Sequence, residues 1–437
     1  MKVAMISLGC SKNLIDSEQM LYKLDEFDYE FCSELDKCEA AIVNTCGFID
    51  EAKQEAIDNI LELAEHKKQG TLKAIIVTGC MAERFRDEIF TEIPEVDAIV
   101  GVGGHLEIAE ILNKALQGDK KSYYFDINAP IIEAGRIPSS GPFTAYIKIA
   151  EGCDNCCAYC VIPSLRGSFR SRKLEDIIDE AKALADGGIK EIILIAQDIT
   201  RYGVDIYKKS MLSELLEQLC EIKAIEWIRL HYMYPSGIDD ELIEVIAKND
   251  KILKYIDIPV QHINNSILKN MNRRYNGNEV KALISKLRSV MPEIVLRTSV
   301  IVGLPGEGEE EFCELCEFLK ENRLERVGVF AFSPQEKTRA AEMENQVDDD
   351  TKNSRKDIIM EIQEKIMADY RQSLLGKEIV VLCEEFDRIA EIWFGRTYAD
   401  SPEIDGKVFF TAERACNPGD FVTVKITETE DELLGVY

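Results

Sequence analysis

Short apolar runs that alternate with longer amphipathic stretches constrain the fold of this chain more than any other feature of its sequence. Near the N-terminus these runs are rich in Val, Ile and Ala, and they are KVAMISLG (2–9), AAIVNTCG (40–47), AIIVTGC (74–80) and AIVGVGG (98–104). Continuous apolar strands separated by helical segments are typical of a parallel sheet that is covered on both faces. We therefore expect an α/β domain over residues 1–126, followed by a linker rich in Pro and Gly at 127–142.

A second series of strand and helix candidates begins after this linker. Its strand candidates are AYIKIAEG (145–152), EIILIAQD (191–198), WIRLHYMYP (227–235), YIDIPVQ (255–261), VLRTSVIVGLPG (295–306) and RVGVFAFSP (326–334). Helical segments separate them near 174–187, 210–221, 238–248, 277–290 and 309–322. Six βα units joined by right-handed crossovers predict a partial or full parallel barrel over 143–372, with its functional residues at the carboxyl ends of the strands.

The pattern changes again toward the C-terminus. A charged helical stretch at 351–376 is followed by short β-like runs that are broken by the turn sequences SPEIDG and NPGD. Strands at this spacing, with Pro and Gly turns, indicate a small antiparallel barrel over 373–437. The predicted fold class is therefore an α/β multidomain protein, with a parallel α/β sheet domain, a central partial (βα)6 barrel similar to a TIM barrel, and a terminal β-barrel.

Composition limits the compartment and the partners. The N-terminal segment has no long apolar region with a cleavage site, and no charge-free apolar stretch is long enough to span a bilayer, so we expect a cytoplasmic protein with no membrane partner. Thiols stay reduced in that compartment, which favours metal ligands, catalytic thiols or small buried side chains over disulfides for the 14 cysteines. The net charge of -28 opposes contact with a phosphate backbone unless a basic patch is held locally.

Four of the cysteines lie in one short segment, EGCDNCCAYC, directly after the first strand of the predicted barrel. Cys153, Cys157 and Cys160 have the spacing C-x3-C-x2-C, which supplies three thiolates. Three thiolates on a cluster of four irons leave one iron open to a small molecule. The triplet with Cys156 in place of Cys157 has the reverse spacing, so spacing alone does not exclude it. A structural zinc site is a further alternative, although no fourth Cys or His lies nearby to complete a tetrahedron.

Three further cysteines each follow a predicted strand of the first domain. Cys10, Cys46 and Cys80 all have a neighbouring glycine. Ligands of an open α/β sheet gather outside the carboxyl ends of its strands, so these cysteines can meet in space although they are distant in sequence. The alternative is that they are buried structural thiols, because free cysteine is among the most buried residue types.

The segment around Cys153, Cys157 and Cys160, with an aromatic residue just before the last cysteine, resembles the radical S-adenosylmethionine superfamily. This resemblance implies that S-adenosylmethionine binds the open iron of a 4Fe-4S cluster and that one electron cleaves it to a 5′-deoxyadenosyl radical. The residues that it suggests for cofactor binding are Tyr159 and, in the strand end VIVGLPGE (300–307), Gly303, Leu304 and Pro305. Gln197 is a further cofactor candidate because it ends the second predicted barrel strand.

Over nearly the whole chain, two sets of three cysteines followed by a small β-barrel resemble the methylthiotransferases, and the terminal barrel is similar to a TRAM domain. The segments most similar to the branch that modifies ribosomal protein uS12 are SLGCSKNLIDSEQM (7–20), CVIPSLRGSFRSR (160–172) and GRTYADSPEIDGKVFF (395–410). In tRNA-modifying relatives the first segment usually contains GCQMN, whereas this chain has GCSKN.

The resemblance implies two 4Fe-4S clusters, of which Cys10, Cys46 and Cys80 hold one. It also implies two S-adenosylmethionine molecules, one as methyl donor and one as radical source. The implied reaction is methylthiolation at the β-carbon of an aspartate of uS12, free or in the small subunit. An electron donor and a sulfur source are the further implied partners.

Arg166, Arg170 and Arg172 form a basic run directly after the cysteine loop. They are candidates for binding a substrate or cofactor carboxylate, which Arg can bind bidentately, and a solvated loop is the alternative. Residues 376–437 hold 6 Lys plus Arg against 14 Asp plus Glu, which favours a basic protein substrate over RNA, while RNA contact remains possible through the ribosome. The alternatives are a tRNA methylthiotransferase and, from another class, a non-enzymatic metal-stabilised protein that binds the ribosome.

Overall fold

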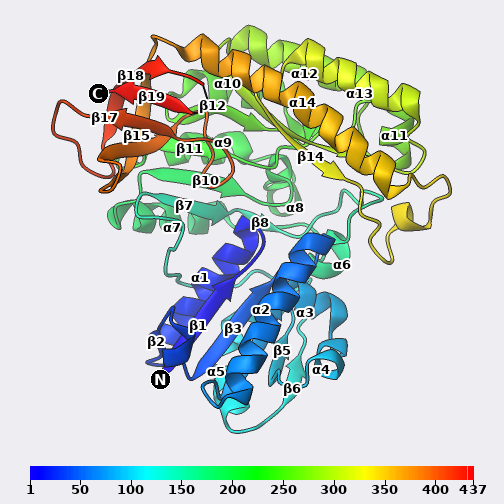
Figure 1. Cartoon of the computed structure of the whole chain (residues 1–437), viewed down its shortest axis with the longest axis vertical. Helices are drawn as coiled ribbons and strands as arrows, with labels where there is room; N and C mark the ends of the chain where they lie inside the picture. The colour runs from blue at the N-terminus through cyan, green and yellow to red at the C-terminus, as the bar shows by residue number, and fades with distance from the viewer. Residues whose placement is uncertain (431) are drawn as a thin grey trace.

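The N-terminal part of the chain forms a six-stranded parallel sheet with the strand order β2-β1-β3-β4-β5-β6 (Figure 1). The computed structural model describes residues 1–430 and 432–437. The strands are β1 (Lys2–Ser7), β2 (Glu30–Phe31), β3 (Ala40–Thr45), β4 (Ala74–Gly79), β5 (Ala98–Val100) and β6 (Lys121–Tyr123). The apolar side chains of β1, β3, β4 and β5 are buried on both faces, as the continuous apolar runs predict.

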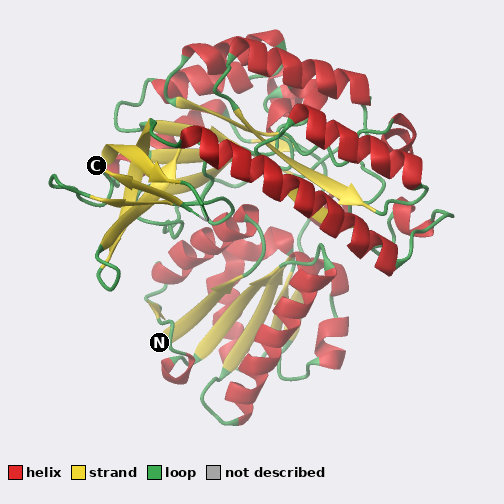
Figure 2. Ribbon diagram, turned by 45° about the horizontal axis from the view of Figure 1, so that its top comes forward, coloured by secondary structure: helices red, strands yellow, loops and turns green. Residues whose placement is uncertain are grey.

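Helices cover both faces of this sheet (Figure 2). One face packs against α1 (Ser11–Asp25) and α5 (Ile108–Leu116), and the other packs against α2 (Asp50–Lys68), α3 (Cys80–Phe85) and α4 (Glu88–Glu92). The 3-10 helices η1 (Leu35–Lys37) and η2 (Val102–Glu107) complete the connections. The short strands β2 and β6 were not expected, since segments of two and three residues carry no periodic signal.

The central part of the chain forms a second parallel sheet, with the order β14-β13-β12-β11-β10-β7. Its strands are β7 (Thr144–Lys148), β10 (Glu191–Ile195), β11 (Trp227–Leu230), β12 (Ile252–Asp257), β13 (Val295–Val302) and β14 (Arg326–Ala331). Each strand pairs with the next of the set along the chain, and β7 and β14 form the two edges. This arrangement confirms the predicted partial (βα)6 barrel.

The longer helices of the central part agree closely with the predicted segments, whereas three short helices of four to six residues were not predicted. In chain order, the helices of this part are α6 (Ile162–Arg166), α7 (Leu174–Asp186), α8 (Val204–Tyr207), α9 (Leu212–Cys220), α10 (Asp240–Lys248), α11 (Asn265–Asn270), α12 (Gly277–Val290), α13 (Glu309–Asn322) and α14 (Asp349–Leu374). Local capping fixes several of these boundaries. Asn276 Oδ1, for example, accepts a hydrogen bond from the Glu279 amide, while the Glu279 carboxylate accepts one from the Asn276 amide.

Shorter elements connect these helices and strands. The antiparallel pair β8 (Ala150–Glu151) and β9 (Arg170–Ser171) brackets the cysteine loop. The 3-10 helices of this region are η3 (Ile199–Arg201), η4 (Pro235–Gly237) and η5 (Arg339–Glu342). Helix α14 runs alongside β14 and α13 and leads to the C-terminal part (Figure 1).

The C-terminal part is a closed five-stranded barrel with the order β15-β16-β17-β19-β18. Its strands are β15 (Glu378–Asp387), β16 (Ile392–Thr397), β17 (Val408–Thr411), β18 (Phe421–Glu428) and β19 (Leu433–Val436). The predicted small barrel is confirmed, and its strand pairs are antiparallel except for β17 with β19, which is parallel. Of the helices in the described part of the chain, none combines the length and apolar character that crossing a bilayer requires.

A buried ion pair network joins the terminal barrel to the central one. Glu191, at the start of β10, accepts hydrogen bonds from Arg229 Nε at 2.8 Å and from Arg396 Nη2 at 2.6 Å. All three side chains are buried. Burial opposes the charge of Glu191, but the two guanidinium groups outweigh it and lower the pKa of this carboxyl to about 2.

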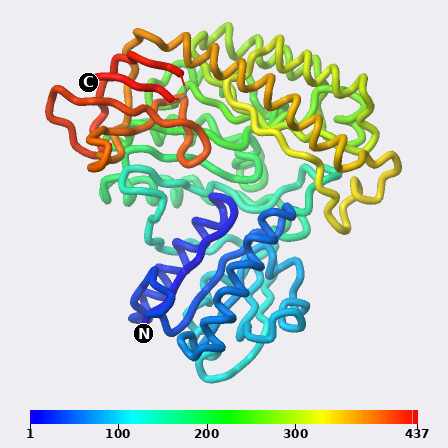
Figure 3. The backbone as a smooth tube through the Cα atoms, viewed as in Figure 1, coloured from blue at the N-terminus to red at the C-terminus, as the bar shows by residue number. Residues whose placement is uncertain are grey.

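The first domain lies against the central barrel, and the chain crosses between them through residues 127–142 (Figure 3). Ile15 of α1 packs against Tyr146 of β7 and Ile195 of β10. Arg136 of the crossing segment donates hydrogen bonds to the buried carboxylate of Glu18 at 2.5 Å and to the carbonyl of Tyr146 at 2.6 Å. Helix α1 therefore covers the mouth of the barrel, where the carboxyl ends of its strands meet.

Candidate functional site

Cys10, Cys46 and Cys80 lie just beyond the carboxyl ends of β1, β3 and β4, and the structure brings these three strand ends together. A Cβ atom built on Gly9 would lie 2.7 Å from the Cβ of Cys46, so only glycine allows this approach. A Cβ atom on Gly47 would lie 2.9 Å from the carbonyl oxygen of Cys80. The neighbouring glycines therefore let the three cysteine loops approach one another closely.

The side chain of Asn13 connects all three loops. Its Nδ2 donates hydrogen bonds to the carbonyls of Leu8 and Thr45, each at 3.0 Å, next to the loops that carry Cys10 and Cys46. Its Oδ1 accepts from the Cys80 thiol at 3.8 Å. Asn13 is 1% exposed, and the sequence analysis missed this role although the residue lies in the GCSKN segment. Asn13 therefore fixes the geometry of the first cysteine set.

The second set lies in the loop between β8 and α6. The thiols of Cys153, Cys157 and Cys160 lie close enough to influence one another electrostatically. Burial raises the pKa of Cys153 to about 11, although a backbone hydrogen bond opposes this rise. Burial also raises the pKa of Cys160. Because burial disfavours a free thiolate here, binding to the cationic iron–sulfur core of a cluster would supply the compensating charge.

Cys156 differs from its neighbours in conformation and exposure. It is exposed and has a φ of 50°. Its carbonyl accepts a hydrogen bond from Asn272 Nδ2 at 2.9 Å. Cys157 is partly buried, and its sulfur accepts a hydrogen bond from Arg273 Nη1 at 3.6 Å. The geometry therefore favours Cys157 over Cys156 as the inward-facing thiol.

Arg273 is a residue of this site that the sequence analysis missed. Its side chain is 9% exposed and also donates from Nη1 to the Tyr159 hydroxyl at 3.4 Å and from Nη2 to the carbonyl of Pro259 at 2.5 Å. Its guanidinium faces the tyrosine that precedes Cys160. The only sequence signal was a pair of arginines in a loop, which gives no indication of this contact.

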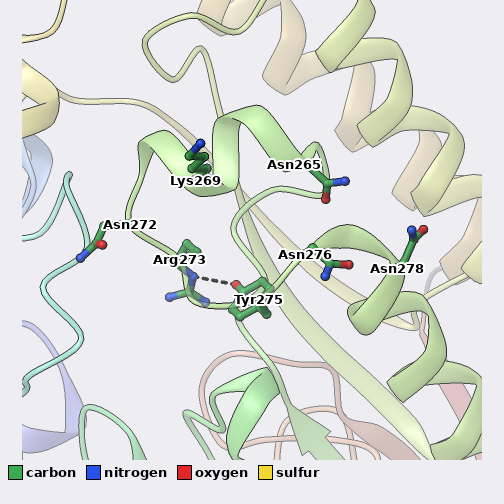
Figure 4. A pocket seen from close by; sticks show the side chains of 7 residues that line it. All are labelled: Asn265, Lys269, Asn272, Arg273, Tyr275, Asn276 and Asn278. Atoms are coloured by element: carbon green, nitrogen blue, oxygen red, sulfur yellow. Dashed lines mark hydrogen bonds between the residues drawn. The ribbon is translucent and has the colours of Figure 1, made fainter.

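A polar pocket of about 520 Å³ lies next to the cysteine loop (Figure 4). Its lining residues are Asn265, Lys269, Asn272, Arg273, Tyr275, Asn276 and Asn278. The Arg273 Nε donates to the Tyr275 hydroxyl at 2.6 Å, which is the dashed line in Figure 4. Asn272 and Arg273 thus belong both to the pocket wall and to the support of the cysteine loop.

The predicted cofactor residues lie around the second cysteine set. Leu304 is fully buried in one apolar cluster with Tyr159. Gly303 has a φ of 72°, and its amide donates to Glu307 Oε1 at 2.9 Å. Glu307 is in turn bound by Arg355 of α14, so the turn that contains Pro305 is held from both sides.

Gln197 lies two residues beyond the end of β10, and its side chain contacts Glu151, which precedes the cysteine loop. Its Nε2 donates to Glu151 Oε1 at 3.2 Å, while its Oε1 is buried without a hydrogen bond partner. A buried acceptor without a partner is costly, so this oxygen is available to a donor group of a bound ligand. The neighbouring Asp198 accepts from Asn155 Nδ2 at 2.9 Å and therefore anchors the cysteine loop to the strand end.

The three arginines of the predicted substrate-binding run differ in their partners. Arg166 is 2% exposed and donates to Glu151 at 2.9 Å, to Asp16 at 2.9 Å and to Asn13 at 2.6 Å. Arg172 pairs with two carboxylates, those of Glu133 and Glu180, each at 2.5 Å. Arg170 donates only to backbone carbonyls, and its Nε lacks a partner. Of the three, Arg170 is the residue whose guanidinium has no carboxylate partner within the described chain.

Arg166 belongs to a four-charge network that joins the first domain to the barrel. Lys148 donates to Asp16 at 2.5 Å and to Glu151 at 2.8 Å, and Arg166 binds the same two carboxylates. Burial opposes the charge of both acids, but Arg166 and Lys148 outweigh it and lower the pKa of Glu151 well below its ordinary range. Arg166 also lies near Cys80, whose pKa burial raises to about 11 while this guanidinium moderates the rise.

Lys12 lies at the same interface. It is 6% exposed, and its ammonium lies 3.0 Å from the ring centroid of Tyr232, just beyond the end of β11. Burial, only partly offset by the nearby acidic groups, lowers the pKa of Lys12 to about 8. The sequence analysis did not identify Lys12 as a functional residue, because a single lysine near a helix start has no distinctive pattern.

Two buried histidines near the barrel strand ends are held by the protein itself. His231 Nε2 lies 3.1 Å from Ser401 Oγ of the C-terminal segment. His262 Nε2 lies 3.4 Å from Glu307 Oε2. The C-x2-C pair Cys313 and Cys316 lies on α13, where Cys316 belongs to the apolar core.

The two cysteine sets adjoin. Cys80 packs in one apolar cluster with Val161 and Leu165, which lie one and five residues after Cys160. Within the described residues, no three Cys, His, Asp or Glu side chains converge as tightly as a single metal ion requires. A four-iron cluster binds each thiolate through a separate iron, so its ligands are spaced more widely than those of one ion. The six thiols range from the exposed Cys10 to the buried Cys80, and the neighbouring Arg166 and Arg273 cations suit an anionic cluster of this kind.

Three segments of the chain match known families. Residues 147–319 match the radical SAM superfamily, residues 2–101 match the uncharacterized protein family UPF0004, and residues 375–436 match the TRAM domain. Among solved structures, the radical S-adenosylmethionine methyltransferase TsrM of Kitasatospora setae superposes with a TM-score of 0.56 at 13% identity, over 75% of this chain and 72% of that chain. The cobalamin-dependent radical enzyme OxsB superposes with a TM-score of 0.51 at 15% identity, over 83% of this chain and 56% of that chain. These structures share the fold.

Relatives with higher identity span the whole chain. The ribosomal protein uS12 methylthiotransferase RimO of Lachnoclostridium phytofermentans is 46% identical over 439 residues, which covers 100% of this chain and 99% of that protein. The protein of the same name from Thermoanaerobacter sp. is 47% identical over 437 residues, again covering 100% and 99%. Identity at this level over the full length of both chains, together with the superfamily and TRAM segments, means that the chain belongs to the RimO family of radical S-adenosylmethionine methylthiotransferases.

Proposed function

We propose that this enzyme adds a methylthio group to the β-carbon of an aspartate in ribosomal protein uS12, either free or in the small subunit, and that it acts in the cytoplasm, where this substrate resides. The observation that carries the proposal is the adjoining placement of the two cysteine sets across the mouth of the barrel, where Cys80 contacts the segment that follows Cys160. Relatives of the same length and family are named for this reaction.

Each cysteine set holds one 4Fe-4S cluster in this proposal. Cys10, Cys46 and Cys80 hold the first, and Cys153, Cys157 and Cys160 hold the second. With two S-adenosylmethionine molecules, one as methyl donor and one as radical source, these groups supply the sulfur and radical chemistry that amino acid side chains lack. An electron donor and a sulfur source are further partners that the reaction requires.

The chain's own residues position these groups. Asn13 holds the three loops of the first set, and Asp198 together with Arg273 holds the loop of the second. Tyr159 and Leu304 form an apolar wall beside the second set, suited to the adenine of S-adenosylmethionine. These contacts fix the reacting groups before substrate arrives, which is how a protein lowers the cost of orientation.

Polar cofactor contacts come from two further places. The unpartnered Oε1 of Gln197 can accept from a donor of the bound cofactor. The backbone around Gly303 and Pro305 forms the turn at the end of β13. Arg170, whose guanidinium lacks a carboxylate partner in the described chain, remains the candidate among the three arginines for a substrate carboxylate, while Arg166 and Arg172 position the surrounding loop.

We propose that the chain has three domains, at 1–126, 143–372 and 373–437, with a linker at 127–142, and that each domain has its own role in the reaction. The matched family segments lie inside these three domains. Arg136 supports the linker assignment because it binds both the first domain and the barrel. The acidic character of the terminal domain favours a basic ribosomal protein over bare RNA as its contact.

Incubation of the reconstituted enzyme with small ribosomal subunits and, separately, with bulk tRNA tests the proposed substrate. Mass spectrometry should find a methylthio group on uS12 in the first reaction and none on tRNA in the second. A methylthio group on tRNA alone would show that the tRNA methylthiotransferase alternative is correct. The non-enzymatic ribosome-binding alternative has no support in the family to which the chain belongs.

A further inference from the structure

Lys12 is a buried cation in the mouth of the barrel whose charge the chain leaves without an acidic partner. It is the second residue of α1 and lies two positions after Cys10. Its ammonium lies over the ring of Tyr232, beyond the end of the barrel strand β11. The side chain therefore spans the space between the first cysteine set and the barrel.

Several neighbouring cations of this mouth are paired with carboxylates. Lys148 and Arg166 share the carboxylates of Asp16 and Glu151. Arg297 donates to Asp257 at 3.0 Å. For Lys12, no hydrogen bond or ion pair is found within the described residues, although its side chain is only 6% exposed.

The contact with Tyr232 does not replace such a partner. A cation over an aromatic ring gains less than a buried ammonium loses in hydration. Asp257, an acid on the barrel side that acts electrostatically on Lys12, is already engaged by Arg297 and by the Tyr232 amide. Lys12 therefore has no carboxylate partner of its own in the mouth of the barrel, where the group that most favours its charge is Cys10.

We propose that Lys12 binds the side-chain carboxylate of the substrate aspartate. This inference rests on the proposed function and gives it a recognition element. A carboxylate bound to this ammonium would lie between Cys10 and the barrel strand ends, so the adjacent β-carbon would lie between the two cysteine sets. Lys12 is thus a substrate-binding residue in addition to the cluster ligands.

Such a contact would also reject neutral substrates. An asparagine or a nucleobase in the same position would offer the ammonium no carboxylate, so the ion pair would be lost and affinity would fall. A site built to pair a substrate group discriminates strongly against analogues that lack the group. Lys12 would therefore determine specificity for an acidic side chain.

The test measures binding of uS12 to the reconstituted holoenzyme by fluorescence anisotropy. The probe is uS12 in two forms, one with the aspartate that the enzyme modifies, as located by mass spectrometry, and one with asparagine there. The enzyme variants are wild type, Lys12→Met, Lys12→Arg and, as a control on the same helix, Lys23→Met. Lys23 is a surface residue paired with Glu26. Iron content and circular dichroism of each variant show whether clusters and fold are retained.

We expect the wild type and Lys23→Met to bind the aspartate form about ten- to a hundredfold more tightly than the asparagine form, the range for a hydrogen bond to a charged group. Lys12→Met should bind both forms equally, and Lys12→Arg should recover part of the preference. An unchanged preference in Lys12→Met, or no preference in the wild type, would overturn the inference. If the wild type neither binds nor modifies uS12 but modifies tRNA, the proposed function itself is wrong, and Lys12 has no carboxylate to bind.

Discussion

Replacing Arg166 by Met should weaken the joint between the first domain and the barrel. Arg166 and Lys148 neutralise Asp16 and Glu151 in a network where all four side chains are at most 10% exposed. After the substitution, one ammonium faces two buried carboxylates. The change also removes the contact of Arg166 with Asn13, which holds the first cysteine set.

The expected cost follows from these contacts. Removing one partner from a buried ion network costs about 3–5 kcal/mol, because a buried charge is left without compensation. For a cooperative unit of 150–250 residues, each kcal/mol lowers the melting temperature by about 2–4 °C, so we expect a shift of about 6–20 °C. The matched control is Arg170→Met, because Arg170 is nearby but donates only to backbone carbonyls and should cost about 1 kcal/mol.

Differential scanning calorimetry is the suitable assay because the domains of a multidomain protein need not unfold in one transition. The first domain and the central barrel should show the loss in Arg166→Met, whereas the transition of the C-terminal barrel should be little changed. Equal small shifts in Arg166→Met and Arg170→Met would refute the structural role of Arg166. They would instead return Arg166 to the set of candidate substrate-binding residues.

Further predictions concern the cysteine loops and the ion pair between Glu191 and Arg396, which joins the central barrel to the terminal one. Cys156→Ala should retain the iron of the barrel cluster and Cys157→Ala should lose it, and the reverse result in an iron assay would make Cys156 the ligand. Asn13→Leu should lower the iron content of the first set while S-adenosylmethionine cleavage at the barrel persists; loss of both would contradict a local role. The depressed pKa of Glu191, about 2, means that its stabilising effect is complete above its ordinary pKa and is lost as the pH falls toward 2. Arg396→Met should therefore move acid unfolding, followed by circular dichroism, to higher pH, and an unchanged midpoint would show that this pair is not stabilising.

Much of the fold could be predicted because a parallel sheet that is buried on both faces has strands rich in apolar residues. The strands of the central sheet are rich in apolar residues, and the longer helices between them begin near the positions that periodicity indicates. The parallel pairing of β17 with β19 could not be predicted, because pairing between strands distant along the chain is set by closure of the barrel and not by local pattern.

The cysteines of the candidate site were visible in the sequence for a similar reason. Each one follows a strand, and the carboxyl ends of parallel strands lie on one edge of the sheet. The supporting residues were not visible. Asn13 and Arg273 act through contacts between segments that are distant along the chain, and these contacts cannot be read from the local sequence, although Asn13 lies in the GCSKN segment. The role of Arg166 could not be predicted either. An arginine that binds carboxylates of its own chain cannot be distinguished by sequence from one that binds a substrate.

Iron content after anaerobic reconstitution tests the central claim, that each cysteine set holds a four-iron cluster, most directly. The wild type should contain about eight irons per chain. Replacing Cys10, Cys46 and Cys80 together by Ala should leave about four irons, and the remaining cluster should still cleave S-adenosylmethionine when reduced. A wild-type value of about four, unchanged by the triple substitution, would contradict the claim by showing that the first set holds no cluster.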